Sequence, residues 1–238
     1  MSDDILTRWK GFVAKTTERY QAILTESDAG FAGLLQDPNL DPITFGNAMN
    51  AIELRIKELR TKLGDVYTEN VVGALHVMGE AAQLMNQTSS WMEEHFEHWR
   101  VGWNGKLVRS IWARAQPLMH ARKDCTKCGA ELTGRTLFHQ AESVSCKHCG
   151  AMNSVSPDNL VYTYFAMAPD MIADEQTVAS KLALERARSS GAGKSRMIEL
   201  SRQHWRAYAT ARAQIAPMSA EEQDRFVESR VRYVEQWG

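Results

Sequence analysis

Long apolar stretches are missing from this 238-residue chain. The most apolar window, VVGALHVMGEAAQLM, spans only residues 71–85 and carries His76 and Glu80. A helix that crosses a bilayer needs about 20 predominantly apolar residues. The first residues, MSDDILTRWKGF, have neither the basic start nor the apolar segment of a secretory signal. These absences predict a cytoplasmic protein with no membrane partner.

Motifs of nucleophilic and cofactor-dependent enzymes are missing as well. The chain contains no G-x-S-x-G sequence, which would place a serine on a sharp strand-to-helix turn. No glycine-rich dinucleotide fingerprint follows a predicted strand. We therefore expect a protein that is not an enzyme, and the sequence indicates no small-molecule substrate.

Cysteine is scarce, with four residues that all belong to two C-x-x-C-G sequences. Cys125 and Cys128 belong to the first sequence and Cys146 and Cys149 to the second, and 17 residues separate the two pairs. This spacing lies in the range of four-thiolate zinc sites, and a reducing compartment leaves thiols available for metal. A C-x-x-C turn points both sulfurs to one side, and the following glycine lets the backbone curl so that amides face them.

These pairs, with Gly129 and Gly150 behind them, resemble the zinc-ribbon family with rubredoxin-like knuckles. The resemblance covers residues 123–155 and implies one structural Zn²⁺, held by four thiolates with no open coordination position. Short strands are expected in TLFHQ, ESVSC and AMNSV. Thioredoxin-like redox chemistry is the competing interpretation, but it requires one C-x-x-C at the start of a helix. Because zinc ribbons serve nucleic-acid binders, enzyme lids and scaffolds alike, the resemblance does not assign a function.

The surface of this module is a possible contact site, formed by Lys127, Arg135, Lys147 and His148. Four thiolates around one zinc leave a local charge of about −2, and the two lysines can offset it. Modules that bind nucleic acid also use aromatic platforms for the bases, and this one offers only Phe138. Nucleic acid is therefore an alternative partner with modest support.

Proline is rare, with six residues, and helical patterns fill the intervals. Apolar residues recur from Phe45 to Met85 at steps of mostly four and three, which predicts one long coiled-coil-like helix or two helices joined near Gly64. We call this row of apolar residues the seam. It needs a partner helix, either from the same chain or from a second copy.

Helix boundaries are expected where capping and turn residues cluster. A first helix should end near residues 27–30, and DPNLDP should form a connector. Further boundaries are predicted at a capping box of Ser90 and Glu93, at Asn104–Gly105, at Ser156–Pro157, at GAGKS, and at a capping box of Ser219 and Glu222. The fold class is therefore mainly α, with a small β ribbon inserted. Residues 1–122 and 156–238 form helical regions around the ribbon, and we expect them to pack as one body.

Charge is segregated along the chain, although the net formal charge is only −1. Residues 1–99 have a balance of −7 and residues 181–212 a balance of +6. The helix predicted over residues 196–212 carries Arg202 and Arg206 beside aromatic residues, which is a plausible nucleic-acid surface. We favour the alternative in which the aromatics enter the core and the arginines pair with the acidic N-terminal half.

The segment WMEEHFEHW places Glu94 and His98 four residues apart on one helical face. A metal site in a helical bundle would need further ligands from other helices, such as His76. A polar helix face is the favoured interpretation. Our main hypothesis is a non-catalytic interaction or scaffold protein, with a protein partner or self-association through the seam. A nucleic-acid-binding factor and, more distantly, a metalloenzyme are the alternatives.

Overall fold

The computed structural model describes residues 2–133 and 140–237. This part of the chain contains six helices and one small antiparallel sheet, so the expected mainly α fold is confirmed. The elements are α1 (Ser2–Gln36), α2 (Pro42–Asn70), α3 (Leu75–Met119), β1 (Glu142–Ser145), β2 (Met152–Val155), α4 (Asn159–Ser189), α5 (Lys194–Ala213) and α6 (Ala220–Trp237). Among the described residues, no helix is long and apolar enough to cross a membrane.

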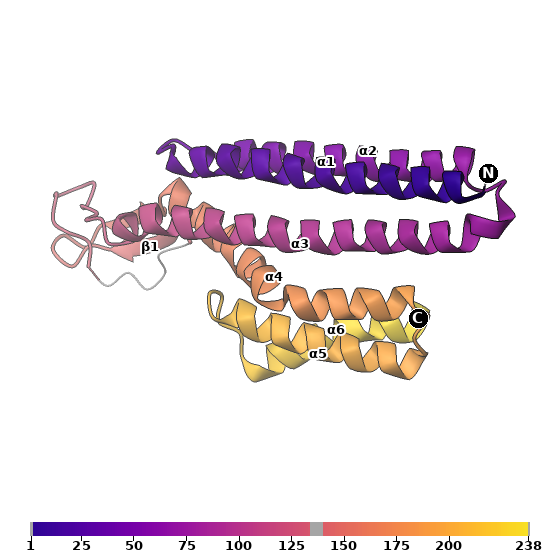
Figure 1. Cartoon of the computed structure of the whole chain (residues 1–238). Helices are drawn as coiled ribbons and strands as arrows, with labels where there is room; N and C mark the ends of the chain where they lie inside the picture. Colours follow the sequence, from indigo (N-terminus) through magenta and orange to yellow (C-terminus); the bar gives the residue numbers. More distant parts are fainter. Residues whose placement is uncertain (1, 134–139, 238) are drawn as a thin grey trace. The chain divides into compact units, whose positions relative to one another are not determined.

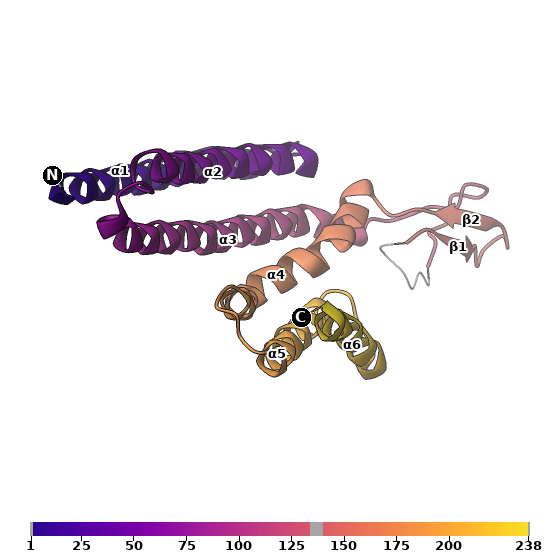
Figure 2. The ribbon, with the colours of Figure 1, turned by 90° about the vertical axis from the view of Figure 1, so that its right-hand side faces the viewer.

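Two compact units divide the chain, Met1–Trp103 and Asn104–Gly238. The boundary falls inside α3, whose first part belongs to the first unit and whose last turns belong to the second. The first unit is a bundle of α1, α2 and the N-terminal part of α3 (Figures 1 and 2). The second unit contains the two strands and α4, α5 and α6.

Buried aromatic side chains set the register between α1 and α3. Trp9 Nε1 donates to the Ala81 carbonyl at 3.2 Å, and Tyr20 Oη donates to the Met92 carbonyl at 3.0 Å. Both contacts join residue i of α1 to residue i+72 of α3, and they are 11 residues apart, which is about three helical turns. The two helices therefore run parallel with one fixed offset.

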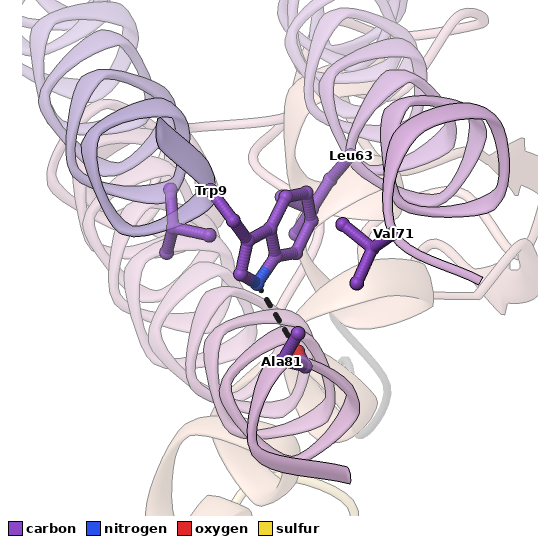
Figure 3. Close-up of a cluster of buried hydrophobic side chains, with 5 residues drawn as sticks. Trp9, Leu63, Val71 and Ala81 are labelled. Carbon is purple, nitrogen blue, oxygen red and sulfur yellow. Dashed lines mark hydrogen bonds between the residues drawn. The ribbon is translucent and has the colours of Figure 1, made fainter. Parts of the chain in front are cut away.

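The seam of α2 is covered within the same chain. Leu63 is fully buried in a cluster with Trp9, Val13, Val71 and Ala81 (Figure 3). Nearer the other end of α2, the ring of Phe45 lies 4.7 Å from that of Phe31 in α1. The seam was expected to pack on a helix of the same chain or of a second copy. In this structure a helix of the same chain covers it.

Three helix boundaries differ from the sequence-based expectation. The first helix does not end near residues 27–30, because Ser27 is buried, donates to the Ile23 carbonyl at 2.6 Å, and precedes the buried Phe31 by one turn. The chain is helical at Gly64, and the break between α2 and α3 falls later, at residues 71–74. Ser90 starts no helix, since α3 runs through it and buries Met92 one half-turn later.

Two more boundaries need correction. Asn104–Gly105 does not interrupt α3; Gly105 instead leaves room for the Glu175 carboxylate of α4, which a Cβ at this position would overlap. Helix α4 starts at Asn159 and not at Pro157, because the carboxylate of Asp158 accepts from the Leu160 N–H at 2.8 Å. Tertiary packing and a competing cap thus decide positions that local preferences leave open.

Other expected boundaries are confirmed. Asp37 and Asp41 organise the DPNLDP connector, where each side chain accepts a backbone N–H two residues ahead. The Ser219–Glu222 capping box forms reciprocally, with the Ser219 N–H donating to Glu222 at 2.7 Å and the Glu222 N–H donating to Ser219 Oγ at 3.2 Å. Helix α4 changes direction partway along its length (Figures 1 and 2), and Pro169 lies inside it without an N–H to donate.

Candidate metal centre

Two turns of nearly identical geometry, which we call the knuckles, bring the cysteines together. In each knuckle the N–H of the first cysteine donates to the carbonyl of the alanine five residues later, at 2.8 Å in both. The N–H of the glycine donates back to the carbonyl of the first cysteine, at 2.9 and 2.8 Å. Gly129 and Gly150 have φ of +74° and +71°, a conformation that other residues rarely adopt. The expected role of both glycines is therefore seen in the backbone.

Two short strands extend from the second knuckle. β1 and β2 pair antiparallel, with Glu142 opposite Val155 and Ser145 opposite Met152. The strands expected in ESVSC and AMNSV are thus present, whereas the one expected in TLFHQ falls on residues 136–140, and 136–139 lie outside the described residues.

The four sulfur atoms lie within 4.8 Å of one another. Cys125 Sγ is 3.7 Å from Cys149 Sγ, and Cys128 Sγ is 3.7 Å from Cys146 Sγ. A tetrahedron with zinc–sulfur bonds of about 2.3 Å has sulfur–sulfur edges of about 3.8 Å. A disulfide would require about 2.05 Å. The arrangement therefore fits a tetrahedral metal ion, and among the described residues it is the one such group of three or more His, Cys, Asp or Glu side chains.

Backbone amides favour ionisation of the first cysteine in each knuckle. The N–H of Lys127 lies 3.4 Å from Cys125 Sγ and is the main reason that the pKa of this thiol falls to about 6. The pKa of Cys146 is lowered chiefly by the N–H of Cys149. These two buried thiols are prepared to act as thiolate ligands.

The pKa of Cys128 is shifted the other way. An N–H from Ala130 lowers it, but the sulfur of Cys149, desolvation and the remaining two sulfurs outweigh that contribution and raise it. Four neighbouring thiols cannot all ionise without a cation, because the negative charges repel one another. A divalent ion would allow all four to ionise, so the donor set and its electrostatics both fit a metal.

Asn153 is a buried polar residue at this site that sequence reasoning missed. It is 4 % exposed, lies on β2, and its Nδ2 is 3.6 Å from Cys125 Sγ. Asparagine is common in turns and unremarkable in a tetrapeptide such as MNSV. The one available signal was its position three residues after a knuckle glycine.

The predicted contact residues of the module are exposed where they are described. Lys127 lies on the first knuckle, Lys147 and His148 lie on the second, and all three side chains face solvent. Arg135 lies outside the described residues. The surface beside the sulfurs is therefore basic and accessible.

The arginines of α5 do not all behave alike. Arg202 pairs with Glu228 of α6, with Nε and Oε1 3.2 Å apart. Its partner therefore lies in the second unit, and the expected pairing with the acidic N-terminal half is wrong for this residue. Arg206 is exposed and has no ion pair in the described part of the chain. The aromatic residues enter the core as predicted. Tyr208 is buried, and Trp205 packs on Phe226 with the two ring centroids 5.9 Å apart.

His204 is a buried histidine between α4 and α5. Ser180 Oγ already donates to the Thr177 carbonyl at 2.8 Å, so it accepts from His204 Nδ1, 2.9 Å away. Burial, aided by the charge of Lys181, lowers the pKa of His204 to about 4. The imidazole is therefore neutral in the folded protein at neutral pH.

We predict a pH-dependent stability from this residue. Above pH 6.5 the imidazole is neutral in both folded and unfolded chains; as the pH falls from 6.5 toward 4, only the unfolded chain binds a proton, and the second unit loses up to about 3 kcal/mol. Urea unfolding of wild type and His204→Gln at pH 7 and pH 4.5 measures the effect. The difference in free energy of unfolding between wild type and His204→Gln should be smaller at pH 4.5 than at pH 7. The same difference at both pH values would contradict the prediction.

Glu94 and His98 do not belong to a metal site in the described residues. His98 is exposed, and His76, the ligand that this alternative needed, lies on the same helix. Twenty-two residues of α-helix separate the two histidines by about 33 Å. The polar helix face, which was the favoured interpretation, describes this segment.

Comparison with family models, with curated proteins and with solved structures finds no match to this chain. The geometry of the four cysteines is therefore the observation from which a function has to be argued.

Proposed function

We propose that this chain is a non-catalytic interaction protein whose ribbon is held together by one structural zinc ion. The observation that carries the proposal is the group of four sulfurs within 4.8 Å of one another. Four thiolates fill all positions of a tetrahedral ion, which leaves none for substrate or water. Zinc and iron are the metals that favour such a site. Cysteines that form no disulfide support a reducing compartment such as the cytoplasm.

A groove on the second unit supports the interaction role. It has a volume of about 700 Å³ and runs along α5. Arg202 and Arg206, which the sequence marked as contact residues, both line it, together with the small side chains of Ala207 and Ala211. Since the seam of α2 is already covered, we place the contact with a protein partner on this groove and not on the seam.

Nucleic acid is supported less well as the partner. Trp205 and Tyr208, the aromatics beside these arginines, pack against Phe226, and the guanidinium of Arg230 lies 5.2 Å from the Trp205 ring. They are therefore not free to stack on bases. Mixed DNA and RNA should show no salt-dependent binding; a steep loss of affinity between 50 and 200 mM salt would favour nucleic acid instead.

The metal is tested on the purified chain. Elemental analysis with native mass spectrometry should give one zinc per chain, and the Cys125→Ser variant should lose it. One iron would change the metal assignment, and no metal in a chain purified under reducing conditions would overturn the proposal. The interaction role is tested in the same spectra and by sedimentation, where a lone monomer without a partner would count against it.

A further inference from the structure

The carboxamide of Asn153 uses its full hydrogen-bonding capacity, two bonds accepted and two donated. Oδ1 accepts from the N–H of Thr126 at 2.9 Å and from Thr126 Oγ1 at 3.0 Å. Nδ2 donates to the Ala151 carbonyl at 2.9 Å and to Cys125 Sγ at 3.6 Å. The side chain starts on β2, two residues after the second knuckle, and reaches two residues of the first.

The orientation of this amide follows from its partners. The backbone N–H of Thr126 can only donate, so the atom facing it is the oxygen. The carbonyl of Ala151 can only accept, so the atom facing it is the nitrogen. The nitrogen therefore presents its second N–H to the sulfur of Cys125, a ligand in the proposed zinc site.

The first knuckle shows that its turn does not require an asparagine. Leu132 occupies the corresponding position there, three residues after Gly129, as Asn153 is three residues after Gly150. Leu132 is 6 % exposed and packs with Val144 and Val155. A polar residue at this position therefore has a task beyond forming its own turn, and its bonds point to the other knuckle.

We infer that Asn153 is a positioning residue that clasps the two knuckles together and holds the Cys125 thiolate toward the metal. This inference rests on the proposed zinc site. The bonds to Thr126 join the knuckles without using the metal, and the N–H···S contact stabilises the charged form of the ligand. Removing a partner of this kind costs typically 10- to 100-fold in metal affinity. The clasp makes the site slow to release its ion.

Release of zinc to an excess of chelator, measured on the full-length chain, tests the clasp. Asn153→Leu introduces the residue of the first knuckle and removes all four bonds, and we expect it to release zinc 10- to 100-fold faster. Asn153→Asp is nearly isosteric and keeps both bonds from Thr126, but it loses the donors. Ser154→Ala is the matched control, since Ser154 is the exposed neighbour on the same strand.

A cobalt-substituted protein separates positioning from general stability. The thiolate-to-cobalt charge-transfer band reports on the sulfurs, so it should shift in Asn153→Leu and Asn153→Asp and stay in place in Ser154→Ala. Thr126→Val, which removes one bond between the knuckles but keeps the N–H···S contact, should speed release without moving the band.

The outcomes separate the clasp from the zinc site itself. A wild-type chain that binds zinc, together with Asn153 variants that match it in release rate and in cobalt spectrum, would overturn the clasp and leave the proposed function intact. A wild-type chain that binds no metal would overturn both. If Asn153→Leu fails to fold, Asn153→Asp and Thr126→Val still decide the question.

Discussion

Replacing Cys146 by serine will release the zinc ion and unfold the ribbon, while the helices of both units stay folded. Cys146 is 2 % exposed and is one of five buried residues in the ribbon's own cluster, two of which are the proposed ligands Cys125 and Cys146. So small a cluster does not stabilise about 35 residues without help. Structural zinc supplies about 10–16 kcal/mol in modules of this size, and that energy is lost with the metal.

Three measurements check this expectation. In Cys146→Ser, zinc per chain should fall toward zero in the presence of a chelator, and limited proteolysis should cut the variant between residues 120 and 158. Far-UV circular dichroism should change little, because the two strands contain four residues each whereas six helices carry most of the signal. Ser145→Ala, at the exposed residue that ends β1 and directly precedes Cys146, should behave as wild type.

A ribbon that resists proteolysis after the metal is gone would contradict this prediction. It would mean that contacts other than the sulfur–metal bonds hold the module. Loss of helical signal in parallel with zinc would contradict it differently, since it would couple the ribbon to the helices.

The cysteine site could be predicted from sequence because its geometry is local. Each knuckle is closed by bonds within six residues, and the glycine that permits the turn follows the second cysteine directly. The only long-range step is the approach of the two knuckles. Asn153 joins the knuckles through Thr126, which is 27 residues away in the sequence. No short sequence motif predicts a contact between residues so far apart.

Helix ends were harder to predict because two local signals competed with tertiary packing. Ser27 and Gly30 together disfavour a helix interior by roughly 1.5 kcal/mol, whereas burying Phe31, which directly follows Gly30, stabilises the helix by about 2 kcal/mol. The same comparison explains why α3 continues through Ser90 toward the fully buried Met92. In both cases burial of an apolar side chain outweighs local helix propensity. A single sequence does not show which helix face another helix will cover.

The offset of 72 residues between α1 and α3 was also invisible in the sequence. The periodic pattern indicates which face of each helix is apolar, but it allows either helix to slide by whole turns. The indole of Trp9 and the hydroxyl of Tyr20 select one register, because each must reach a backbone carbonyl when buried.

Trp9→Ala will destabilise the first unit by about 3 kcal/mol, the lower end of the range for buried tryptophan. The side chain is 3 % exposed, packs on Leu63 and Val71, and donates to the Ala81 carbonyl (Figure 3). Its ring also lines a hollow of about 480 Å³ that Ile5 and Phe12 share. Because this hollow opens to solvent, water can enter the vacated space, and we therefore expect the smaller value and not about 5 kcal/mol.

Trp9→Phe separates the ring from its hydrogen bond. Phenylalanine keeps most of the apolar surface and loses the Nε1 donor, so about 1 kcal/mol is expected from the missing bond. Leu54→Ala, at a side chain that is 59 % exposed, should change stability by less than about 0.5 kcal/mol. Hydrogen exchange of peptides from α1 and α2 in increasing urea reads out this unit without interference from the other. If Trp9→Ala and Leu54→Ala cost the same, the cluster around Trp9 does not hold α1 in register, and the bonds of Tyr20 and Asp28 to α3 would have to do so alone.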